Sequence, residues 1–200
     1  MATKYLPFVM LGCVACSSSS LLAYLMMNSS EDPATGPTGP TTPQGPVPVL
    51  PSAQYVKVER PTGTYPGNIV NLAEIEVFDK AGINIALNAA VTGGPWNHPS
   101  GPWANLTDGD YSNYAHTKDD GVGFLQVNLG AVKEIAKVVI TNRGNNADGG
   151  CCGNRLGDAK LILLDASSTA VKTTAVIDTT KLKITYDFNV ATPAWVYADA

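Results

Sequence analysis

The sequence has little charge and no excess of positive charge. Only 15% of its 200 residues are charged, and 17 acidic residues stand against 13 basic ones. Because a phosphate backbone is held by clustered lysines and arginines, this balance argues against nucleic acid as a partner. Four cysteines are also too few to frame a disulfide-rich miniprotein. The common catalytic motifs (nucleophile elbow, H-E-x-x-H, P-loop, dinucleotide fingerprint) are absent, so we expect a protein that is not an enzyme.

Most of the chain has the pattern of short β-strands. Nineteen glycines and fourteen prolines indicate many turns. Apolar and polar residues alternate in 73–77, 125–129 and 182–188, and further β-rich runs cover 55–60, 135–141 and 159–164. In the first run, Glu74 and Glu76 are expected to face solvent. No stretch predicts a long amphipathic helix, so residues 53–200 are predicted to fold as an all-β, antiparallel jelly-roll β-sandwich.

Residues 1–28 are predicted to be an N-terminal membrane anchor. Positions 5–27 form 23 residues without a charge, which as a helix is long enough to cross a bilayer. A cleaved signal peptide and a lipoprotein cleavage box at Leu11-Gly12-Cys13 are the alternatives. Lys4 precedes the span while Glu31 and Asp32 follow it, which favours a single-pass protein with its domain outside, on a cell or virion surface.

Residues 29–52 are predicted to be a semi-rigid linker between the anchor and the domain. Seven of the fourteen prolines lie here, with no apolar periodicity. The Gly-Pro spacing is too irregular for a collagen helix.

The most distinctive polar segment is the Gly-rich loop 142–156. It holds two arginines and two adjacent cysteines, namely Arg143, Arg155, Cys151 and Cys152. A bond between adjacent cysteines would close a strained ring, so free thiols or pairing with another chain are alternatives. Zinc is not expected, because adjacent thiols lack the usual ligand spacing.

A series of motifs resembles the F-type (fucose-binding) lectins and, more broadly, the discoidin or coagulation-factor C-type domains. The resemblance covers residues 54–165 and rests on Asn105-Leu106-Thr107-Asp108-Gly109-Asp110, Ala115-His116-Thr117, Leu125-Gln126-Val127-Asn128-Leu129-Gly130, Val139-Ile140-Thr141-Asn142-Arg143 and Cys151-Cys152-Gly153-Asn154-Arg155-Leu156. In the family motif twenty-six residues separate a His from an Arg, and twenty-six residues likewise separate His116 from Arg143.

The resemblance implies a carbohydrate-binding site. In it His116, Arg143 and Arg155 would donate hydrogen bonds to sugar oxygens, and a Cys151–Cys152 ring would lie against the apolar face of the sugar. The chain departs from the family after Arg143, where six residues, 145–150, precede the cysteines. Asp148 is the candidate for the missing carboxylate. In the alternative, the two arginines only form ion pairs with acids such as Asp148 or Asp158.

The same resemblance implies calcium as a cofactor. The predicted ligands lie in one loop: Asn105, Asp108, Asp110 and Asn113. Carboxylates and carbonyls are the oxygen ligands that calcium prefers. An ordinary Asp-Gly turn has the same sequence and is the alternative.

Two functions are consistent with these features. Segments 55–60 and 71–78 resemble short anchored discoidin-like proteins of large DNA viruses, which implies a minor capsid or virion membrane protein that ties membrane lipid, through residues 5–27, to other structural proteins. The alternative is a surface lectin for fucose-type glycans, with weak single sites strengthened by multivalent display.

Overall fold

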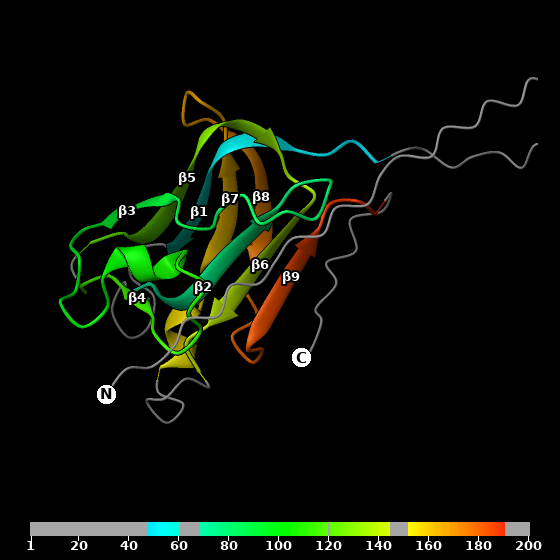
Figure 1. The fold of residues 1–200 in the computed structure, drawn as a ribbon. Helices are drawn as coiled ribbons and strands as arrows, with labels where there is room; N and C mark the ends of the chain where they lie inside the picture. Colours follow the sequence, from blue (N-terminus) through cyan, green and yellow to red (C-terminus); the bar gives the residue numbers. More distant parts are fainter. Residues whose placement is uncertain (1–47, 61–68, 120, 145–151, 191–200) are drawn as a thin grey trace, which may run out of the picture. The chain divides into compact units, whose positions relative to one another are not determined.

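The protein is described here from a computed structural model, in which residues 48–60, 69–119, 121–144 and 152–190 are described. All of them belong to one compact unit, Pro43–Ala200. Nine β-strands form two antiparallel sheets in this part of the chain, and the only helices there are two short 3-10 turns (Figure 1). The predicted all-β architecture of two antiparallel sheets is confirmed.

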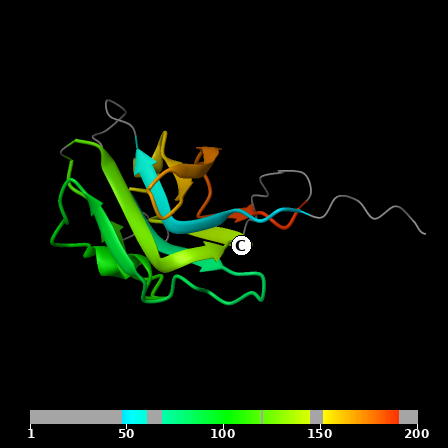
Figure 2. The ribbon, with the colours of Figure 1, turned by 90° about the horizontal axis from the view of Figure 1, so that it is seen from above.

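The larger sheet has five strands in the order β3-β5-β1-β7-β8. Its strands are β1 (Ser52–Arg60), β3 (Ala90–Gly94), β5 (Gly123–Glu134), β7 (Lys160–Leu164) and β8 (Ala170–Val176). Strand β1 pairs with both β5 and β7, and Figure 2 shows β1 and β5 running side by side. Val56 and Val58 of β1 are buried at alternate positions, as a strand with one face toward a core requires.

The smaller sheet has four strands in the order β4-β2-β6-β9. It consists of β2 (Asn71–Phe78), β4 (Ala115–His116), β6 (Lys137–Asn142) and β9 (Lys183–Asp187). Strand β4 is only two residues long and pairs with the start of β2, where Asn71 lies opposite His116. Because β4 pairs only with the start of β2, the loops before and after β4 lie at that end of the smaller sheet.

One apolar core lies between the sheets. Both contribute fully buried side chains, including Val58, Leu125 and Leu161 from one sheet and Ile75 and Ile140 from the other. The predicted alternation in 125–129 and around Ile184 and Tyr186 is confirmed. The expectation for Glu74 is wrong: its side chain is fully buried, because the loop after η1 (Trp103–Leu106) covers this position of β2.

Several predictions fall outside the described residues. These include the membrane anchor 1–28, most of the linker 29–52, Asp148 and Cys151. Within the part of the chain that the structure describes, no helix is long and apolar enough to cross a membrane.

Candidate functional site

The candidate site is built on a two-stranded ribbon that extends β4. Asn97 and Thr117 form an antiparallel bridge. On either side of it, the His98 amide donates to the His116 carbonyl and the Lys118 amide donates to the Trp96 carbonyl, both at 3.0 Å. Thr117 is fully buried and its hydroxyl accepts from the Val70 amide at 2.9 Å. Because successive strand residues point to opposite faces, the neighbours of Thr117 face away from this buried side.

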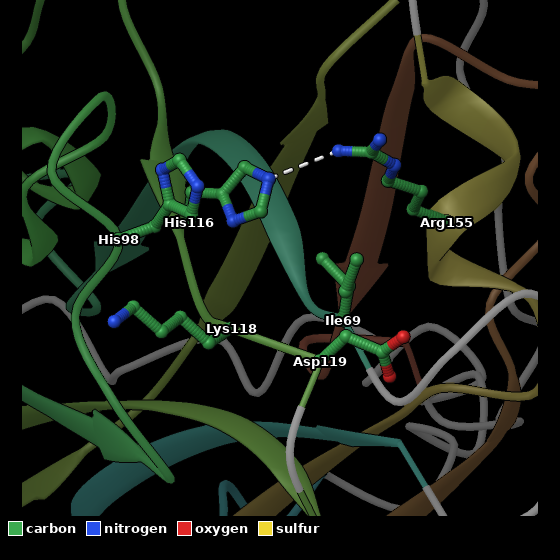
Figure 3. A pocket seen from close by; sticks show the side chains of 6 residues that line it. All are labelled: Ile69, His98, His116, Lys118, Asp119 and Arg155. Carbon is green, nitrogen blue, oxygen red and sulfur yellow. Dashed lines mark hydrogen bonds between the residues drawn. The ribbon is translucent and has the colours of Figure 1, made fainter.

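The opposite face of the ribbon lines a pocket of about 470 Å³. Six of the described residues line it: Ile69, His98, His116, Lys118, Asp119 and Arg155. Figure 3 shows the two imidazoles side by side, with Arg155 reaching toward His116 from the 3-10 turn η2 (Gly153–Leu156). The ring centroids of His98 and His116 lie 4.4 Å apart. The pocket therefore joins residues from four separate segments of the chain.

His116 is neutral and both of its ring nitrogens are engaged. Burial, with a smaller contribution from the nearby charges of His98, Arg155 and Arg143, lowers the pKa of His116 to about 4, while the hydrogen bond to the Thr117 carbonyl opposes the shift. Nδ1 donates to the Thr117 carbonyl, and Nε2 lies 2.9 Å from Nη1 of Arg155. Since a guanidinium can only donate, Nε2 is the acceptor of that bond. His116 thus holds Arg155 in place, and Arg155 keeps further N–H groups for a ligand.

Arg60 connects two sides of the pocket from beneath. This side chain at the end of β1 is 1% exposed. Its Nη1 donates to the Arg155 carbonyl at 3.0 Å and the Ile69 carbonyl at 3.4 Å, and both of these residues line the pocket. Burial lowers the pKa of Arg60, while the carboxylates of Asp158 and Asp119 oppose that shift. Arg60 is therefore a positioning residue for the site.

Arg143 lies beside the pocket and does not line it. It is buried, and its guanidinium carbon lies 3.5 Å above the centre of the Tyr114 ring. Such a cation–π contact fixes the guanidinium plane. Cys152 is half-buried and disulfide-bonded, whereas Cys13, Cys16 and Cys151 are outside the described residues. The structure thus brings His116, Arg143 and Arg155 to one end of the smaller sheet, with Cys152 directly before η2.

The predicted calcium ligands lie in the loop that follows η1. The Asp108 carboxylate accepts from the Asp110 amide at 2.9 Å and from Nδ2 of Asn113 at 2.8 Å. The Asp110 carboxylate accepts from the amide and hydroxyl of Ser112, which lowers the pKa of Asp110. Nδ2 of Asn105 donates to the Tyr114 carbonyl. The described residues contain no group of three or more His, Cys, Asp and Glu side chains placed to hold a metal ion.

Glu74 adds a buried carboxyl to this loop. Its Oε1 accepts from the Gly109 amide at 3.3 Å, but Oε2 has no hydrogen-bond partner among the described residues. The carbonyl oxygen of the Asn113 side chain is likewise buried without a partner there. Burial raises the pKa of Glu74 to about 8, and the charges of Asp108 and Asp110 contribute. Buried carboxyl and amide oxygens without partners are the ligand type that a hard cation such as calcium prefers.

Three functional residues escape the sequence analysis. His98, Arg60 and Glu74 belong to segments whose patterns indicate only a loop and two strands. The burial of the two charged residues comes from contacts with η2 and with the loop after η1, far away in sequence. For Glu74 the local sequence carries no signal of burial, because it stands in an alternating strand at a position where a charge normally faces solvent.

Comparison with known proteins supports a galactose-binding-like domain. Residues 105–195 match a family model described as a NedA-like, galactose-binding domain of the F5/F8 type C group. The matched segment includes His116, Arg143 and Arg155, while Glu74 and His98 precede it. No curated protein and no solved structure matches the chain significantly.

Proposed function

We propose that this domain binds a terminal sugar of a glycan, without catalysis, in the pocket beside His116. The observation that carries the proposal is the bond between neutral His116 and Arg155 inside a pocket of about 470 Å³. It leaves a rigid guanidinium aimed into an open cavity. A sugar edge offers acceptor oxygens that such donors bind. The galactose-binding-like match supports the same class of ligand.

Fucose-type and galactose-type sugars are the proposed ligands. In this proposal Arg155 donates to ring and hydroxyl oxygens, Arg143 and His116 hold the surrounding geometry, and a Cys151–Cys152 ring provides an apolar surface. Asp148 is the proposed acceptor for sugar hydroxyls.

The Cys151–Cys152 ring is tested separately. Mass spectrometry of the unreduced, digested protein identifies the partner of Cys152.

The binding test is a glycan array with the full-length chain in a detergent that has no sugar headgroup. Wild type should give signal on glycans with terminal fucose or galactose. Arg155→Ala should lose that signal, whereas Lys133→Ala, which removes an exposed lysine outside this pocket, should keep it. A blank array with folded wild type, or undiminished binding by Arg155→Ala, contradicts the proposal.

We further propose that calcium stabilises the loop after η1. Glu74, Asp108, Asp110 and Asn113 would hold the ion, with Asn105 keeping the loop shape. Calcium would supply the positive charge that lets the Glu74 carboxyl ionise inside the fold. The unpartnered Oε2 of Glu74 supports this proposal.

A membrane-tethered docking function stays a second proposal. It rests on the uncharged run 5–27 and on the sequence resemblance to anchored virion proteins, where the same domain would meet other capsid proteins. Flotation of the full-length chain with liposomes tests the anchor: the chain should float, and deletion of 5–27 should leave it at the bottom. Failure to float contradicts the tether but leaves glycan binding untouched.

A further inference from the structure

The ribbon that lines the pocket continues beyond it to Trp96. In the antiparallel register Trp96 lies opposite Lys118, just as His98 lies opposite His116, with the Asn97–Thr117 bridge between them. Directly opposed residues, and residues two apart, share one face of such a ribbon. His98, His116 and Lys118 all line the pocket. The register therefore places Trp96 on the same face, one step farther out than His98.

Trp96 is exposed to an unusual extent for its size. Its side chain is 61% exposed, the largest apolar side chain among the exposed ones in the described residues. Lys118 lies opposite Trp96 and is also exposed. Among the described residues, its ammonium group has no hydrogen-bond or ion-pair partner. An exposed indole opposite an exposed lysine offers a flat apolar surface and a hydrogen-bond donor on one face of the ribbon.

We propose that Trp96 and Lys118 form a second subsite that binds the next sugar ring of an oligosaccharide. This inference rests on the proposed function, in which the terminal ring occupies the pocket at Arg155. The C–H face of the second ring lies on the Trp96 indole, and the Lys118 ammonium donates to its hydroxyl oxygens. Since the subsite continues the same ribbon face, one glycan spans both. The ligand is therefore an oligosaccharide of at least two rings.

The test compares ligands that share one terminal sugar. An array carrying fucose or galactose alone, and each extended by one to three rings, selects the best matched pair for titration calorimetry with the full-length chain. In Trp96→Ala, the affinity for the extended ligand should fall at least tenfold, while that for the monosaccharide should stay within twofold. Lys118→Gln should cause a smaller loss of the same kind. Ile83→Ala, which removes an apolar side chain of equal exposure on another loop, should change neither.

Tryptophan fluorescence gives a second readout. The chain has three tryptophans, and Trp103 is partly buried. The extended ligand should change the emission of wild type, and Trp96→Phe should retain binding while losing most of that change.

The outcomes separate the two proposals. Equal losses for both ligands in Trp96→Ala, or no loss for either, overturn the second subsite while glycan binding stands. Wild type that binds neither ligand overturns the proposed function, and the subsite with it.

Discussion

The pocket and the acidic loop differ in how completely the protein satisfies its own polar groups. In the pocket, both nitrogens of His116 have partners and Arg60 fixes Arg155 from below. In the loop, Oε2 of Glu74 and Oδ1 of Asn113 are buried without partners among the described residues. Under the proposed functions, the pocket is therefore preorganised for a ligand, whereas the buried carboxyl of the loop needs a proton or a cation to neutralise it.

The two regions also respond to pH in opposite directions. Burial raises the pKa of Glu74 and lowers that of His116. The Glu74 contribution to stability is present below the ordinary pKa of about 4.5 and is lost as pH rises through about 8. The His116 contribution is present above its ordinary pKa of 6.5 and is lost as pH falls through about 4. Each region can thus be weakened while the other is kept intact.

The largest expected effect comes from removing the support of the pocket. Arg60→Ala leaves the Ile69 and Arg155 carbonyls without their buried donor, so unfolding should become easier by about 2–4 kcal/mol. Glycan affinity should fall as η2 loses its anchor. Urea titration measures the first effect and calorimetry the second.

The effect of calcium on the stability of Arg60→Ala tests whether the pocket and the loop are independent. Because the two regions share no residues, the stabilisation by calcium should be the same in Arg60→Ala as in wild type, within about 0.5 kcal/mol. If calcium no longer stabilised Arg60→Ala, the pocket and the loop would form one cooperative unit. If Arg60→Ala were as stable as wild type, Arg60 would not support the pocket.

The second-largest expected effect is the pH dependence of stability that comes from Glu74 and the loop after η1. Without calcium, the melting temperature should fall between pH 6.5 and pH 8, above the ordinary pKa of His116, because the folded state must keep a proton on Glu74 or bury its charge. Calcium at about a hundred times its Kd should restore about 2.7 kcal/mol at pH 8. Glu74→Gln should abolish both the slope and the calcium response. Scanning calorimetry in chelator and in calcium measures these quantities.

The matched control is Glu76→Gln, which changes a half-buried carboxyl two residues along the same strand. It should keep the slope and the calcium response. A chelated wild type whose melting temperature is flat over this range would refute the account of Glu74.

Much of this fold can be predicted from the sequence, but the surroundings of its polar residues cannot. Val56, Leu125 and Ile184 alternate with polar neighbours, so local pattern predicts their strands and their burial. The same pattern fails for Glu74 because alternation in one strand does not show that a distant loop covers its outer face. Arg60 escapes for the same reason, since its partner Arg155 follows 95 residues later.

For the site, the spacing of His116 and Arg143 predicts that the two residues lie close together, and the structure places both beside Tyr114. Their roles depend on contacts that spacing does not show: His116 holds Arg155, and Arg143 stacks on Tyr114. The ribbon that adds His98 has too little periodicity to be predicted, because it is a single bridge between two loops.

The third effect concerns the packing behind the pocket. A Cβ at Gly101 would lie 2.8 Å from Cβ of His116 and 2.8 Å from Cδ2 of Tyr114. Gly101→Ala should therefore cost about 1–3 kcal/mol of stability and weaken glycan binding by displacing His116. Gly144→Ala is the control, since its nearest neighbour would be 3.9 Å away. Should both variants melt and bind alike, the close packing behind His116 does not control the site.

The smallest effect concerns the charge state of His116. Affinity for a neutral sugar should be constant from pH 8 to about pH 5.5 and then fall about twofold by pH 4, where half of the imidazoles become protonated. A protonated ring cannot accept from Arg155, and it adds a positive charge beside Arg155, Arg143 and His98. Calorimetry across this range gives the midpoint. His98→Asn removes the only other histidine and with it one of the charges that lower the pKa of His116, so the midpoint should rise slightly and stay well below 6.5. A midpoint near 6.5 would mean that His116 titrates as an exposed imidazole, and the hydrogen bond that positions Arg155 would then not form in solution.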